Sequence, residues 1–176
     1  MTRPEQITTA RLTLRKPRLA DTDALHQAMR QPQAMRYWGH PEHETAARTA
    51  EYLAQMIHNN AIGGDDFVIE HQGRVIGKAG MWRLPEVGFL LHPDHWGKGL
   101  AAEAMGAVLE HLFTWADTDH LTAEVDPRNA ASLGLLARLG FQETHRATRT
   151  MQWRDEWCDS IYLSLPRVRW QGHNSR

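Results

Sequence analysis

The segment that most constrains the fold joins a strand to a helix through a turn with two glycines, at residues 86–116. Residues 86–91 alternate between two sides as a strand does, and apolar positions from residue 101 onward recur at helical spacing. Between them stand Gly97 and Gly99, which leave the backbone N–H groups of the turn accessible. The N-terminus of a helix also attracts anions. The sequence therefore predicts a binding site for a phosphate or diphosphate at this turn.

The rest of the chain supplies strands and helices for one α/β domain, which we expect to span residues 1–176. Short β-rich runs predict strands at residues 11–15, 67–69, 75–77, 121–125, 148–153 and 160–165, with Gln72 and Gly73 as a hairpin turn. Helical spacing predicts a short helix with Leu25, Ala28 and Met29, a longer one with Ala46, Ala50, Leu53 and Ile57 on one apolar face, and a third from Asn129 to Leu139, closed by Gly140 and Phe141. Strands and helices mixed in this order indicate a sheet with helices on both faces.

Composition excludes several classes of protein. Lys and Arg number 20 against 21 Asp and Glu, and this balance argues against a nucleic-acid-binding face. No apolar run approaches the roughly 18 residues of a membrane span, and Cys158, the single cysteine, excludes an internal disulfide. We expect a cytoplasmic protein without nucleic-acid or membrane partners. The histidines predict no metal site, because Pro93 interrupts the spacing of His92 and His95 and no second cluster follows.

Two other phosphate-binding motifs can be tested against the chain. No GxxxxGK[ST] run is present, so the sequence does not predict a P-loop. Gly97, Gly99 and Ala102 fit the GxGxxG/A pattern of dinucleotide-binding folds. That turn comes late in the chain, however, and residues 117–119 do not end a clean second parallel strand. A nucleotide-cofactor domain is therefore the weaker alternative.

Several motifs, in the expected order, resemble those of the GCN5-related N-acetyltransferases (GNAT). Residues 96–101 resemble the acyl-CoA motif [QR]-x-x-G-x-[GA], with Trp96 in place of Gln or Arg. A second motif follows at residues 129–132 and 138–141. The stretches at residues 11–15, 35–39 and 157–160 resemble the RimJ/RimL-type branch. The resemblance implies the GNAT fold, a central mixed, mostly antiparallel sheet of six to seven strands with one splayed strand pair and helices on both faces.

The resemblance also implies acetyl-CoA as co-substrate, with no metal. The diphosphate of CoA would lie on the amides of Gly97, Lys98, Gly99, Leu100, Ala101 and Ala102. Pantetheine would pair with the main chain at Phe89, Leu90 and Leu91, and Asn129 would hydrogen-bond the CoA arm. The strands at residues 86–91 and 121–125 would splay apart to admit it, and their free N–H groups would polarise the thioester carbonyl.

Acyl transfer requires a neutral amine, so a general base helps the reaction. Glu86 and Glu124 match base positions of two groups of relatives, and the choice between them stays open. Leu136 stands where many relatives carry a tyrosine acid, whereas Ser132 matches a hydroxyl of RimL-type relatives. The residues expected to line the acceptor pocket are Tyr37, Trp38 and Trp82.

We therefore expect an acetyl-CoA-dependent N-acetyltransferase that transfers the acetyl group directly from the thioester to a primary amine. The amine would belong to a protein N-terminus or to a small molecule. Cys158 has no obvious histidine partner, so no acyl-enzyme is expected. The alternative is a catalytically silent acyl-CoA-binding or sensor protein, because the tyrosine acid is missing. A monomer or a homodimer is compatible with either function.

Overall fold

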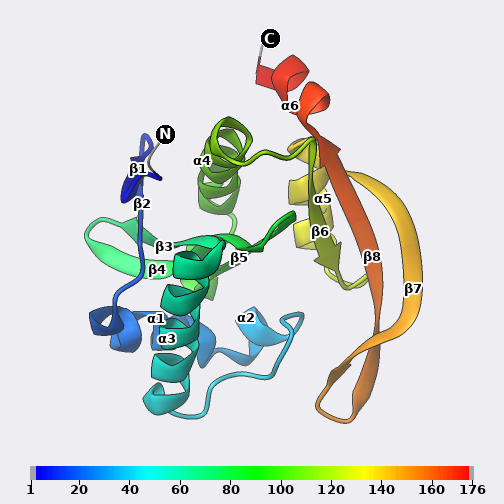
Figure 1. The fold of residues 1–176 in the computed structure, drawn as a ribbon. Coiled ribbons are helices and arrows are strands. Elements are labelled where there is room, and N and C mark those ends of the chain that lie inside the picture. The colour runs from blue at the N-terminus through cyan, green and yellow to red at the C-terminus, as the bar shows by residue number, and fades with distance from the viewer. Residues whose placement is uncertain (1–2, 175–176) are drawn as a thin grey trace.

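The computed structural model describes residues 3–174 of the chain. The described backbone forms one eight-stranded sheet in the order β1-β2-β3-β4-β5-β6-β8-β7 (Figure 1). The strands are β1 (Gln6–Thr8), β2 (Leu12–Arg15), β3 (Asp65–His71), β4 (Arg74–Arg83), β5 (Glu86–Leu91), β6 (His120–Val125), β7 (Gln142–Trp153) and β8 (Glu156–Pro166). The helices are α1 (Thr22–Met29), α2 (Pro32–Met35), α3 (Ala46–Ile62), α4 (Leu100–Trp115), α5 (Ala130–Arg138) and α6 (Arg167–Asn174), with 3-10 turns η1 (Leu19–Asp21) and η2 (Pro93–His95). None of these described helices is both long and apolar enough to cross a bilayer.

The sheet opens between β5 and β6. All other neighbouring strands run antiparallel, whereas β5 and β6 run parallel and pair at a single register position, Glu86 with Thr122. At that position the Thr122 N–H donates to the Pro85 carbonyl at 2.9 Å. Beyond it the two strands diverge, as the centre of Figure 1 shows. The predicted splayed pair and the mixed, mostly antiparallel sheet are confirmed.

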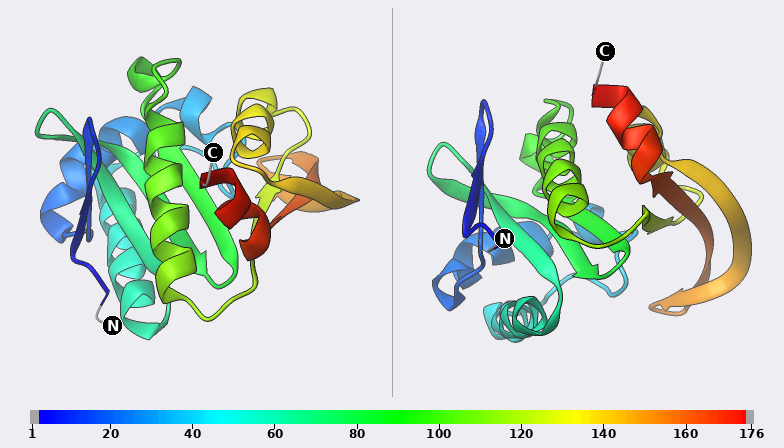
Figure 2. Two further views of the ribbon diagram at one scale, coloured as in Figure 1. Left: turned by 90° about the horizontal axis from the view of Figure 1, so that it is seen from above. Right: turned by 45° about the horizontal axis from the view of Figure 1, so that its top comes forward.

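Helices cover both faces of the sheet, as predicted (Figure 2). The larger core lies between the sheet and α4–α6, with Leu109 and Leu135 among its buried residues. The smaller core lies on the opposite face and takes Leu25 and Leu53 from α1 and α3. Since β5 contributes Leu90 to the smaller core and its neighbours on the strand to the larger one, its side chains alternate between the two faces.

Two local predictions hold in detail. Gln72 (φ 52°) and Gly73 (φ 76°) form the tight turn between β3 and β4. At the end of α5, Gly140 (φ 96°) reverses the chain and the Phe141 N–H donates to the Leu136 carbonyl at 3.0 Å. This bond is the one expected when a glycine closes a helix and an apolar residue follows it.

Other expectations need correction. The sheet has eight strands rather than six or seven, because the three residues of β1 are too few to show a pattern. β7 and β8 are longer than predicted, since they pair as a hairpin over polar residues that carry no β signal. Neither α2 nor α6 was predicted.

The buried face of α3 also differs from the predicted one. Ile57 is exposed, and the buried stripe runs instead through Thr49, Leu53 and Met56. Thr49 tolerates burial because its hydroxyl lies 2.9 Å from His26 Nδ1 and 2.8 Å from His43 Nδ1. Because Thr49 is polar, hydrophobic spacing does not mark it as buried, and the predicted apolar face of α3 was therefore displaced from the observed one.

Candidate active site

A cleft of about 770 Å³ opens where β5 and β6 diverge. Its walls come from α2 and the residues after it, the end of β5, the turn before α4, and α5 with the residues before it. These segments are far apart in the sequence, and the sheet topology brings them together. The structure places most of the residues predicted to bind CoA in this cleft, namely Phe89, Leu90, Leu91, Gly97, Gly99, Leu100, Ala101, Ala102 and Asn129.

The turn before α4 presents free amides. Gly97 (φ 71°) and Gly99 (φ 74°) adopt left-handed backbone conformations, which glycine reaches without steric cost. Gly99 caps α4 without a side-chain hydrogen bond, and no group of the described residues accepts from the N–H groups of residues 97–102. Such donors at the positive end of a helix suit a diphosphate. The Lys98 side chain lies outside the cleft, because its ammonium donates to the Asp94 carbonyl at 2.7 Å.

The end of β5 also exposes a main-chain edge. Just beyond this strand the His92 N–H donates to the Ile76 carbonyl at 2.8 Å. Main-chain direction alternates along an antiparallel ladder, so Phe89 and Leu91 direct their N–H and carbonyl groups away from β4. They point toward the opening, where β6 no longer pairs with β5.

Two details of this edge differ from the predicted pantetheine contacts. The Trp96 indole N–H donates to the Leu91 carbonyl at 2.9 Å, so that acceptor is already used. By the same alternation the N–H and carbonyl groups of Leu90 point toward Lys78 on β4, and only the Leu90 side chain borders the cleft. Phe89 is therefore the residue of β5 that offers both a free donor and a free acceptor.

The start of α5 forms the facing wall. The Asn129 side chain caps the helix, since its Oδ1 accepts from the Ser132 N–H at 3.2 Å. Asn129 and Ser132 both line the cleft. Leu136, at the position of the missing tyrosine, is buried in the larger core.

The two predicted bases lie together, but outside the lining of the cleft. Glu86 and Glu124 stand at nearby positions of β5 and β6, on the face of the sheet that α1–α3 cover, and both side chains are exposed. Desolvation by neighbouring atoms and, next, the Glu124 carboxylate raise the pKa of Glu86, while Arg83 opposes the shift. A carboxylate with a raised pKa suits proton abstraction near neutral pH.

Hydroxyl groups fix Glu124 in place. The buried Ser160 hydroxyl donates to Glu124 Oε1 at 2.5 Å, and the Thr150 hydroxyl lies 2.6 Å from that of Ser160. Tyr162 pairs with Glu124 across β6 and β8, and burial together with the Glu124 charge raises the pKa of the phenol. Sequence reasoning missed this group, because only the register of β6 against β8 brings Ser160 to Glu124.

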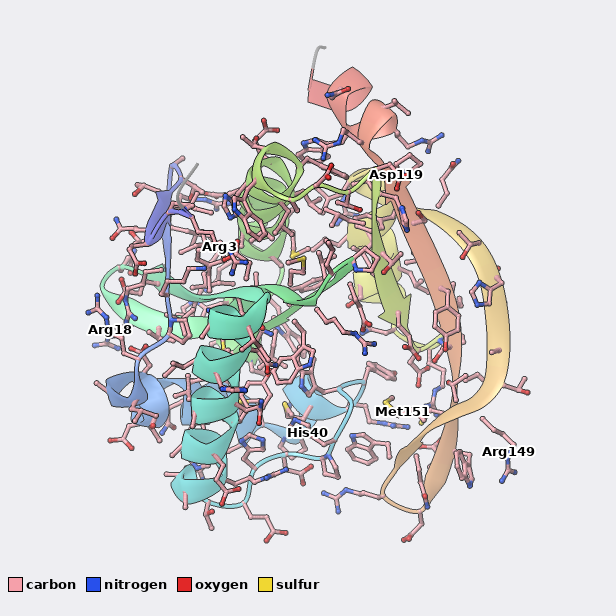
Figure 3. The ribbon with its side chains drawn as sticks, in the orientation of Figure 1. Arg3, Arg18, His40, Asp119, Arg149 and Met151 are labelled. Carbon is pink, nitrogen blue, oxygen red and sulfur yellow. The ribbon has the colours of Figure 1, made fainter. Side chains whose placement is uncertain are left out.

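The predicted aromatic residues divide into two sets. Tyr37 and Trp38 line the cleft, and Trp38 packs over Gly88, where an added Cβ would lie 3.8 Å from its ring. Trp82 is not in the lining, because its ring stacks with that of Tyr52 on α3, with 6.1 Å between the ring centroids. Met151 on β7 points toward the loop after α2 (Figure 3), where its sulfur lies 4.0 Å from the place that a Cβ on Gly39 would take.

Two arginines of the cleft were also missed. Arg128 makes ion pairs with Asp126 at 2.6 Å and with Glu156 at 2.5 Å. Glu156 also pairs with Arg36 at 3.0 Å, and both guanidinium groups lie near the face of the Tyr37 ring. Glu156 therefore links the residue that follows α2 to the segment between β6 and α5. No local pattern signals a link between residues this far apart in the sequence.

The histidines pack in separate groups. His40 stacks on His43 with ring centroids 5.0 Å apart, and both lie beside Tyr52. Burial, followed by the nearby His40 and Arg48, lowers the pKa of His43 to about 4. Among the residues whose side chains are described, no group of three or more His, Cys, Asp or Glu could hold a metal ion.

An amide-lined turn at the head of a helix, beside a strand edge opened by a splayed parallel pair, is the arrangement of an α/β acyltransferase. A family model described as an acetyltransferase (GNAT) domain matches residues 11–142, most of the chain. The chain belongs to the GNAT family and is an N-acetyltransferase. The nucleotide-cofactor alternative is therefore wrong.

Relatives in sequence agree with this assignment. The chain is 32% identical over 149 residues to the uncharacterized N-acetyltransferase p20 of Bacillus licheniformis, a match that covers 79% of this chain and 83% of the relative. It is 27% identical over 130 residues to the spermidine N(1)-acetyltransferase of Escherichia coli (strain K12), covering 69% and 67% of the two chains.

Solved structures share the fold. RimL, described as a ribosomal L7/L12 α-N-protein acetyltransferase, matches with a TM-score of 0.82 and 16% identity over 92% of this chain and 94% of its own. The microcin C7 self-immunity acetyltransferase MccE, solved with acetyl-CoA and AMP, matches with a TM-score of 0.77 and 15% identity over 93% and 97%. At these identities the likeness establishes the fold.

Proposed function

We propose that this N-acetyltransferase takes its acetyl group from acetyl-CoA and transfers it directly to a primary amine. One observation carries the proposal, namely that the free amides of residues 97–102 and the open edge of β5 border the same cleft. A diphosphate and a chain with peptide-like amides require these two surfaces side by side. The MccE structure, which contains acetyl-CoA, supports this choice of donor.

The donor would be held by main-chain groups. The amides of the turn would bind the diphosphate, and the free main chain of Phe89 would pair with pantetheine. An N–H group aimed at the thioester carbonyl stabilises the negative charge that develops on its oxygen. Phe89 is our candidate for this donor, because its N–H faces the opening between β5 and β6.

The acceptor would approach from the α1–α3 face. Its amine nitrogen attacks the thioester carbonyl carbon, so that a C–N bond forms and the C–S bond breaks. The proton lost by the amine passes to Glu86, directly or through a water molecule, since Glu86 lies outside the cleft lining. The departing thiolate takes a proton from solvent or from Ser132, which lines the cleft. Glu124 would keep the acceptor face negative beside the base and so attract an ammonium group.

Both kinds of acceptor have precedent among similar proteins. The name of the Escherichia coli relative gives spermidine, and that of RimL gives a protein N-terminus. The acidic pair at Glu86 and Glu124, near the aromatic Trp38, favours a cationic amine of either kind. The resemblance of residues 11–15, 35–39 and 157–160 to RimJ/RimL-type chains supports that branch of the family.

The experiment is an acetyl-transfer assay with acetyl-CoA and a panel of amines, comparing the wild type with Glu86→Gln. We expect kcat/KM to fall about 100-fold while acetyl-CoA affinity is retained, because a general base contributes about this much. Glu51→Gln, an exposed glutamate on α3, is the matched control and should keep full activity. Full activity of Glu86→Gln would transfer the base role to Glu124.

A silent acyl-CoA-binding protein is the second candidate. The buried Leu136 in place of a tyrosine acid favours it. The loss of that acid is small in energetic terms, because a thiol with a pKa near 8.5 lies only about 1.5 units above neutral pH. Tight binding of acetyl-CoA without turnover of any amine in the panel would support this candidate over the enzyme.

A further inference from the structure

The cleft contains a guanidinium group without a counter-charge. The ionisable side chains that line it are Arg36, Tyr37, His95, Arg128 and Arg138, and none of them is a carboxylic acid. Arg36 and Arg128 are already paired with carboxylates, and burial lowers the pKa of His95, which favours its neutral form. Among the described residues, no carboxylate forms an ion pair with Arg138. Arg138 is therefore the permanent positive charge of the cleft that remains uncompensated.

The position of this guanidinium is defined by the helix that carries it. Arg138 is the last residue of α5, and its Nη1 lies 3.6 Å from the place where a Cβ on Gly134 would stand. Helical side chains lean toward the N-terminus of their helix, which directs Arg138 back over Gly134. Both residues line the cleft. Glycine is unfavourable inside a helix, so its presence here is best explained by the space that it leaves in the wall.

We propose that Arg138 binds the 3′-phosphate of CoA and makes the protein discriminate CoA from 3′-dephospho-CoA. The inference rests on the proposed use of acetyl-CoA. The diphosphate already has the amides of residues 97–102 on the other wall, so a cation on α5 serves a different phosphate. A phosphate monoester carries up to two negative charges and three acceptor oxygens, which the planar fork of a guanidinium matches.

A competing explanation is that Arg138 only stabilises α5. A cation in the last turn of a helix interacts favourably with the helix dipole. If Arg138 had only that role, removing its charge would lower thermal stability. The effect on binding would then be the same for every ligand. Ligand selectivity therefore separates the two explanations.

The test is calorimetric titration with CoA and with 3′-dephospho-CoA, for the wild type, Arg138→Gln and Arg48→Gln. Arg48 lies on α3 in an exposed pair with Glu51 and serves as the control. We expect Arg138→Gln to bind CoA about 10- to 30-fold more weakly, the loss of one charge-assisted contact, and to bind 3′-dephospho-CoA within about twofold of the wild type. Arg138→Lys keeps the charge but not the planar guanidinium, and its affinity for CoA should lie between those of the wild type and Arg138→Gln. This variant remains informative should Arg138→Gln fold poorly.

The outcomes separate the inference from the proposed function. Equal weakening toward both ligands, or no change toward CoA, overturns the assignment of Arg138. A wild-type protein that binds the two ligands equally well overturns it too. Failure of the wild type to bind either ligand contradicts acetyl-CoA as the donor, and the inference with it.

Discussion

Protonation of His43 should destabilise the folded protein in mild acid. His43 is 2% exposed, and burial together with His40, Arg48 and His26 lowers its pKa to about 4, with Glu51 opposing. In the unfolded chain a histidine titrates near pH 6.5. Between these two values the unfolded state binds a proton that the folded state does not, so stability is complete above about pH 6.5 and falls as the pH decreases. At pH 4.5 the loss amounts to about 2.5 kcal/mol.

This loss is measurable, because small domains have a total stability of only about 5–15 kcal/mol. Urea unfolding followed by tryptophan fluorescence at pH 7.5, 5.5 and 4.5 gives the free energy of unfolding at each pH. The carboxylates with lowered pKa values, among them Asp21, Asp65 and Asp126, lose their contribution mainly below pH 4, outside this window.

Two variants identify the group responsible. His43→Gln should lose most of the dependence on pH between 6.5 and 4.5, whatever its stability at pH 7.5. The lowered pKa of His95 leaves a smaller dependence of the same sign. His58→Gln, an exposed position on α3, should keep the wild-type dependence. A wild type as stable at pH 4.5 as at pH 7.5, or a His43→Gln variant whose free energy of unfolding keeps the full wild-type dependence on pH, would show that His43 is not responsible.

Three further changes have defined outcomes. Gly97→Glu should weaken CoA binding at least about 100-fold in calorimetry. The added carboxylate stands at the proposed diphosphate site, and like charges about 4 Å apart repel by about 4 kcal/mol at a surface. Lys78→Met should cost about 3–5 kcal/mol of stability in urea unfolding, because it leaves Asp66, its buried partner at 2.8 Å, unpaired. Glu124→Gln should move the acid limb of the pH–rate profile of kcat/KM to lower pH, because removing this negative charge lowers the pKa of Glu86.

Each change has a control or a result that would contradict it. Gly73→Glu, in the exposed turn between β3 and β4, should leave CoA binding intact, and unchanged affinity of Gly97→Glu would contradict the site. The double variant Lys78→Met with Asp66→Leu should recover most of the lost stability. A pH–rate profile of Glu124→Gln identical to that of the wild type would mean that the two carboxylates do not interact.

The sequence alone determined the elements whose signals are local. Two glycines before an amphipathic helix fix a turn with exposed amides, because no side chain stands in the way at residues 97 and 99. Gln72 with Gly73 determined a hairpin, and Gly140 with Phe141 closed α5. In each case the atoms that interact are a few residues apart, so their spacing is visible along the chain.

The tertiary structure decided which distant side chains meet. Ser160 reaches Glu124, and Glu156 reaches Arg36 and Arg128, only through the order and register of the strands. These contacts bring together groups whose separation along the chain carries no period, so no pattern could signal them. For the same reason the chain alone could neither place Trp82 outside the lining of the cleft nor single out Arg138 as the unpaired charge of the cleft, since burial and counter-charge exist only once the strands are assembled.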